Sequence, residues 1–240
     1  MATIINKIQT LSSLNIDAMF FHSAVNNLSI AKENQILANE AKVELMSIEW
    51  LEDYEAWELG DEIDVSFSDE DMDYVEGLKD KDRDTYSIFL QAVATTHIFC
   101  VAALEAHINK QSEKLFNGKL LDHFEKLPLE GKWLFLPQLM HLNSFTPGKQ
   151  PFQNFSKLIK TRNILVHYKG KPIPYDYSKD AVEHYKSLGL TISAAEESIT
   201  TTVGMVSKLA EILGNEPPKW LKSTASEYLD IETTYKKGEI

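Results

Sequence analysis

The chain has 240 residues, of which 43% are hydrophobic and only 18 are Gly or Pro (10 and 8), so it can bury a core and wholesale disorder is excluded. Its one cysteine, Cys100, excludes an internal disulfide and favours a reducing compartment. A formal net charge of −12 argues against nucleic-acid partners if it is taken for the whole chain. No long apolar segment follows Met1, so we expect no signal peptide, no membrane span and a cytoplasmic location.

The charge is unevenly distributed along the chain. Residues 52–76 contain twelve acidic residues and no Lys or Arg, and outside this segment acidic and basic residues balance. Residues 131–175 contain no Asp or Glu and carry seven basic residues. The net charge therefore does not describe the chain well, because one segment is strongly acidic and another is basic. The basic segment is compatible with an anionic binding partner.

Apolar residues at helical spacing predict a long helix, with an internal break left open, over residues 15–58. Residues 60–82 are acidic and are predicted to be a loop or a short, weakly ordered element. The strongest helical pattern covers 83–117, which lacks Gly and Pro and ends before Gly118. Further helices are predicted over 119–126, 132–142, 151–168, 178–187 and 191–213, with a short last helix after Pro217-Pro218.

No strand pattern and no internal repeat is recognisable, so the predicted fold class is all-α, an antiparallel helical bundle with a long N-terminal helical extension. We expect residues 1–85 to form that extension, including the acidic segment. Residues 86–215 are expected to form the main helical domain, and residues 216–240 a short C-terminal helix and tail.

The stretch "TRNILVHYKG" (161–170) contains the candidate site residues Arg162, Asn163 and His167. Asn163 and His167 are four residues apart and share a helical face, and the long Arg162 side chain can reach toward the same place. A guanidinium suits phosphate, and an imidazole can give or take a proton near neutral pH. We expect the intervening aliphatic residues, 164–166, to hold the helix on the core.

A second candidate is Glu105, which helical geometry places in an apolar stripe with Val101 and Ile108. A buried carboxylate must be protonated or paired, and the best partner is Arg162, in a neighbourhood without acidic residues. The alternative is a purely structural ion pair or a partly exposed side chain.

The run "LIKTRNILVHYKG" resembles the RNxxxH signature of the HEPN superfamily, a group of small all-α proteins that includes metal-independent ribonucleases and toxins. "TTHIFCVAALEAHINKQSEKLF" is similar to the first core helix of that fold, including its Glu. The resemblance covers residues 86–213 and leaves residues 1–85 unexplained.

The resemblance implies that Arg162 holds the scissile phosphate, that His167 acts as general acid or base, and that Asn163 orients them, with Glu105 in support and no metal or other cofactor. The lysines expected to bind RNA are Lys157, Lys160, Lys169 and Lys171. One His per chain implies a homodimer with a composite site, and a regulatory protein or antitoxin is a further expected partner of a toxin or phage-defence effector. The alternative is a non-catalytic module for dimerisation or nucleotide sensing that keeps the motif as a polar cluster.

Overall fold

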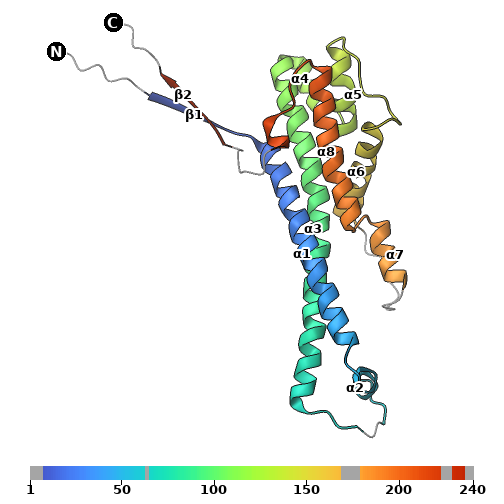
Figure 1. Ribbon diagram of the computed structural model, residues 1–240. Coiled ribbons are helices and arrows are strands. Elements are labelled where there is room, and N and C mark those ends of the chain that lie inside the picture. Colours follow the sequence, from blue (N-terminus) through green and yellow to red (C-terminus); the bar gives the residue numbers. More distant parts are fainter. Residues whose placement is uncertain (1–7, 63–64, 169–178, 223–228, 236–240) are drawn as a thin grey trace, which may run out of the picture. The chain divides into compact units, whose positions relative to one another are not determined.

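The computed structural model describes residues 8–62, 65–168, 179–222 and 229–235 (Figure 1). The helices are α1 (Ile16–Met46), α2 (Leu51–Glu58), α3 (Asp69–Leu115), α4 (Gly118–Glu125), α5 (Leu129–Leu139), α6 (Phe152–Val166), α7 (Lys179–Ser187), α8 (Ile192–Ile212) and the 3₁₀ turn η1 (Lys219–Leu221). The predicted all-α helical bundle is confirmed. Among the described residues, the feature outside this class is an antiparallel ladder of β1 (Ile8–Leu14) and β2 (Leu229–Tyr235), which the sequence pattern did not reveal.

The chain divides into two compact units, each built from separate stretches of sequence. Unit 1 comprises Met1–Val25, Thr96–Lys171 and Glu196–Ile240, and unit 2 comprises Asn26–Thr95 and Pro172–Ala195. Residue 85, the predicted end of the N-terminal extension, lies inside α3, so the backbone has no break there.

Aromatic and aliphatic side chains from α1, α3, α5, α6 and α8 form the core of unit 1. Trp133 of α5 and Phe155 of α6 are both fully buried, with ring centroids 5.7 Å apart. Leu104 of α3 and Met205 of α8 are fully buried in the same cluster. Burial of such side chains, at roughly 1.5–3 kcal/mol each, is the main force that holds these helices together.

The acidic segment is largely helical, so the prediction of a loop over 60–82 is wrong from residue 69 onward. Ser68 forms a capping box with Asp71. The Asp71 N–H donates to Ser68 Oγ at 3.1 Å, and the Ser68 N–H donates to Asp71 Oδ2 at 3.1 Å. Acidic residues in the first turn favour a helix because they complement the positive end of its dipole, and three of them, Asp69, Glu70 and Asp71, begin α3.

Unit 2 contains an aromatic cluster that anchors α2. Trp50, Tyr54, Trp57 and Phe67 contact one another with centroid separations between 5.3 and 6.1 Å. The predicted long helix over 15–58 does break, since α1 ends at Met46 and α2 begins at Leu51.

Polar contacts join α2 to the beginning of α3. Tyr54 Oη donates to Glu76 Oε1 at 3.3 Å, and Lys79 Nζ lies 2.6 Å from Glu58 Oε2. Burial raises the pKa of the Tyr54 hydroxyl, and the adjacent Glu76 raises it further. The carboxylates of Glu58 and Glu76 are therefore partly balanced by Lys79, which follows the acidic segment on α3.

Beyond residue 117, α4 to α8 begin and end within three residues of their predicted positions. Helix α3 is the one described helix whose length and composition would suit a membrane span, but half of its most apolar stretch is buried inside the protein. The central helix of a globular core passes the same test, and the predicted location stays a prediction.

Candidate functional site

Helix α6 carries the candidate site residues at its C-terminal end. Phe152, Phe155 and Leu158 recur every three residues and are buried, so they form the face that holds α6 on the core. The helix ends at Val166, and His167 follows as its C-cap residue, whose backbone N–H donates to the Asn163 carbonyl oxygen at 3.0 Å. The motif therefore straddles the last turn of α6.

The motif side chains are accessible and unengaged. Arg162 is half-buried, and Asn163 and His167 are exposed. Within the described ranges, no residue forms an ion pair or a hydrogen bond with the side chains of these three. A polar cluster kept for core packing would instead have its donors satisfied inside the fold.

The aliphatic residues inside the motif do not act as predicted. Ile164 is 46% exposed and Val166 is 51% exposed, so the expectation that residues 164–166 hold the helix on the core is wrong for these two, whereas Leu165 is half-buried. Three consecutive helical residues span about 200° and cannot all face one side. Tyr168, just after the helix, is 44% exposed. Ile164, Val166 and Tyr168 are called the α6 patch below.

Glu105 does not support the motif as predicted. Its side chain is half-buried rather than enclosed, beside the fully buried Leu104 on α3. None of the described contacts joins Glu105 to Arg162, so the expected ion pair is not formed within the chain. The neighbouring core positions are filled by Leu104 and Ile108, which leaves Glu105 at the edge of the core.

The four lysines predicted to bind RNA differ in their surroundings, and two of them lie outside the described residues. Lys157 Nζ lies 2.7 Å from Glu197 Oε2 of α8 in an exposed ion pair. Lys160 is exposed on α6. Lys169 and Lys171 lie outside the described residues. Exposed ion pairs contribute about 0–1 kcal/mol, so Glu197 does not prevent Lys157 from binding another anion.

Sequence reasoning missed a buried pair of ionisable side chains in unit 1. Nδ1 of His107 on α3 lies 2.8 Å from Oδ2 of Asp17 on α1, and both side chains are at least 96% buried. Lys110 Nζ lies 3.7 Å from Asp17 Oδ1 and also donates to Asn15 Oδ1. The signal available in the sequence was two ionisable residues, Asp17 and His107, each inside an apolar helical pattern.

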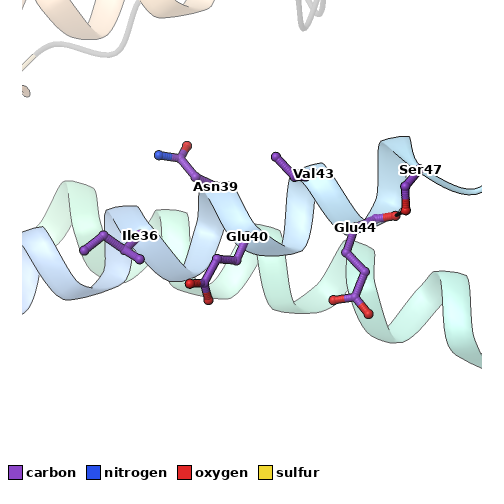
Figure 2. Close-up of a pocket in the computed structure, with 6 residues that line it drawn as sticks. All are labelled: Ile36, Asn39, Glu40, Val43, Glu44 and Ser47. Atoms are coloured by element: carbon purple, nitrogen blue, oxygen red, sulfur yellow. Dashed lines mark hydrogen bonds between the residues drawn. The ribbon is translucent and has the colours of Figure 1, made fainter.

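In the described part of the chain, the structure has two surface depressions that are not lined by the motif residues. One, of about 280 Å³, has Asp17 and His107 among its lining residues. The other, of about 430 Å³, is open and lies along α1, where Figure 2 shows Ile36, Asn39 and Val43 on the helix surface. Ile36 and Val43 are 57% and 69% exposed.

Comparison with known proteins finds no matching family model, no matching curated protein and no matching solved structure. The HEPN resemblance thus rests on the motif residues and the helices that carry them. Among the described residues, no group of three or more His, Cys, Asp or Glu side chains is placed to hold a metal ion.

Proposed function

We propose that the chain is a metal-independent endoribonuclease of the HEPN type, which cleaves RNA through attack of a ribose 2′-hydroxyl on the adjacent phosphate. The observation that carries the proposal is the accessibility of Arg162, Asn163 and His167. They are gathered in the last turn of α6, and no described side chain engages theirs. Groups that bind a phosphate or transfer a proton must be accessible and not engaged by other side chains before the substrate binds.

Each motif residue has a distinct chemical task in this reaction. The Arg162 guanidinium binds the scissile phosphate and stabilises the charge that develops on it. The His167 imidazole takes the proton from the 2′-hydroxyl or gives one to the leaving oxygen. The Asn163 amide orients these groups, and the product carries a 2′,3′-cyclic phosphate.

A single chain supplies one motif histidine, whereas the reaction uses both a base and an acid. A two-fold dimer with two α6 ends facing one another supplies both. The exposed α6 patch supports this arrangement, because Ile164, Val166 and Tyr168 lose apolar exposure when a second α6 covers them. The homodimer is therefore part of the proposal.

The test is cleavage of labelled RNA in EDTA by the wild-type protein and by His167→Ala. We expect cleavage by the wild type, with cyclic phosphate ends, and a loss of at least 100-fold in the variant. His123→Ala, which removes an exposed histidine from α4, is the matched control and should keep full activity. Cleavage that survives His167→Ala contradicts the assigned role.

The second candidate function is a non-catalytic dimerisation or nucleotide-sensing module. It is favoured by the missing Glu105–Arg162 pair and by the positions of the two depressions, neither of which is lined by motif residues. If neither the wild type nor His167→Ala cleaves RNA while the wild type is dimeric, this second function gains support.

A further inference from the structure

The depression of about 280 Å³ in unit 1 lies where the start of α1, the C-terminal part of α3 and η1 meet. Asp17, His107 and Lys110 line it together with Lys114, Lys219 and Trp220. None of its lining residues belongs to α6. It is therefore a feature separate from the motif that carries the proposed function.

The floor of this cavity is a rigidly held ionisable pair. Asp17 Oδ2 and His107 Nδ1 are hydrogen-bonded at 2.8 Å, and both side chains are almost completely buried. The His107 ring stacks on Trp133 at 6.3 Å and meets Trp220 edge-on at 5.9 Å. A histidine and a carboxylate bonded and packed in this way have fixed orientations, as binding and catalytic sites require.

One buried carboxylate oxygen of this pair lacks a hydrogen-bond donor. Asp17 Oδ1 has no hydrogen-bond partner in the described part of the protein, although it is inaccessible from bulk solvent, and its nearest cation, Lys110 Nζ, lies 3.7 Å away. A buried carboxylate oxygen without a donor is costly. A ligand hydroxyl group that enters the cavity can supply that donor.

The charge around the cavity is positive. Three amines, from Lys110, Lys114 and Lys219, face a single carboxylate, Asp17. This surplus of positive charge favours an anionic ligand, and a phosphate monoester, with two negative charges, suits several amines better than a single carboxylate group does. Lys114 and Lys219 are exposed at the rim and can close on a ligand as it enters.

We propose that this cavity is a binding site for a small phosphate monoester that also carries a hydroxyl group, such as a phosphorylated sugar. The rim lysines Lys114 and Lys219 hold the phosphate, and Asp17 Oδ1 accepts a hydrogen bond from the hydroxyl group. His107 is a positioning residue that fixes the Asp17 carboxylate. The volume admits a ligand of this size and excludes a polynucleotide from its interior.

The test is isothermal titration calorimetry of the full chain with ribose 5-phosphate, inorganic phosphate and ribose, without RNA. We expect binding of ribose 5-phosphate, weaker binding of phosphate, and none of ribose. The double variant Lys114→Gln/Lys219→Gln should weaken ribose 5-phosphate binding at least tenfold. Lys119→Gln/Lys126→Gln, which removes two lysines that do not line the cavity, should leave it unchanged.

Both lysine variants alter exposed residues, so each is expected to fold, and circular dichroism checks this. Failure of ribose 5-phosphate to bind at millimolar concentration overturns the proposal, as does equal binding by the Lys114/Lys219 variant. Binding should persist in His167→Ala. This last result distinguishes failure of the phosphate-site proposal from failure of the proposed ribonuclease function.

Discussion

Nδ1 of His107 lies 2.8 Å from Oδ2 of Asp17, although the two residues are 90 positions apart in the chain. The contact ties the first turn of α1 to α3 inside unit 1. Burial raises the pKa of the Asp17 carboxyl, but the hydrogen bond and charge of His107 and the charge of Lys110 outweigh it. The net result is an Asp17 pKa below its ordinary value of 3.8.

Removal of the Asp17 carboxylate should destabilise the protein strongly. Asp17→Ala leaves the buried His107 ring without its partner, and loss of one member of a buried pair costs about 3–5 kcal/mol. Urea denaturation at pH 7, followed by circular dichroism, measures the difference. Asp122→Ala, at an exposed position on α4, should change stability by less than about 0.5 kcal/mol. Equal stability of the two variants would show that the pair contributes nothing.

The same pair predicts a pH dependence of stability. Because the folded-state pKa of Asp17 is lowered, its contribution is present above the unfolded-state value near 3.8 and is lost as pH falls through the folded-state value. The stability gap between wild type and Asp17→Asn should therefore shrink as the pH falls below about 4. Thermal unfolding at a series of pH values measures it. A gap that widens below about pH 4 contradicts the assignment.

Cys100 should be unreactive in the folded protein. Burial raises the pKa of its thiol to about 12, while a hydrogen bond with Thr202 opposes the change, and the side chain is fully buried. A thiol in this state is protonated and inaccessible at pH 8. We expect no reaction with a disulfide reagent until the protein is unfolded in guanidinium, when one thiol per chain should react. Rapid labelling of the native protein would contradict this.

The α6 patch should be the contact surface of the proposed dimer. Ile164→Lys places a charge in the patch, where it would be desolvated in the dimer and hydrated in the monomer. Light scattering at micromolar concentration should show a dimer for the wild type and a monomer for the variant, with an unchanged helical circular dichroism spectrum. Ile36→Lys, at a comparably exposed position on α1, is the control and should stay dimeric. A monomeric wild type removes the composite site from the proposal.

The first turns of α3 should depend on the Ser68 cap. Ser68→Ala removes the oxygen that accepts from the Asp71 N–H, at a cost of about 0.5–2 kcal/mol. Hydrogen exchange of amides near residues 70–74 should accelerate, and amides near Cys100 should be unaffected. Ser66→Ala, an exposed change just before the helix, is the matched control.

The helices beyond residue 117 were predictable because their signals are local. Glycine at position 214 and proline at 151 mark helix ends wherever the rest of the chain lies. The start of α3 was missed because its acidic residues indicated a solvated segment, although the Ser68–Asp71 spacing of a capping box was present.

In the two candidate sites, too, features that depend on local sequence were predictable, whereas contacts between distant residues were not. The position of Asn163 and His167 at one end of a helix follows from local pattern, and the structure places them there. The Asp17–His107 pair does not, because no local rule relates residues separated by 90 positions. Helical geometry places Glu105 in an apolar stripe, but Leu104 and Ile108 fill the core positions. Glu105 lies half-buried at the edge of the core, which agrees with the alternative of a partly exposed side chain.

The tryptophans give each unit its own optical reporter. Trp133 and Trp220 lie in unit 1, where they are fully or almost fully buried, whereas Trp50 and the 44% exposed Trp57 belong to unit 2. Buried indoles emit at shorter wavelengths than hydrated ones, so intrinsic fluorescence contains two separable signals. A Trp50→Phe/Trp57→Phe variant would leave tryptophan emission from unit 1 alone. Comparison of its melting curve with that of the wild type would show whether one unit melts before the other, without any attached dye.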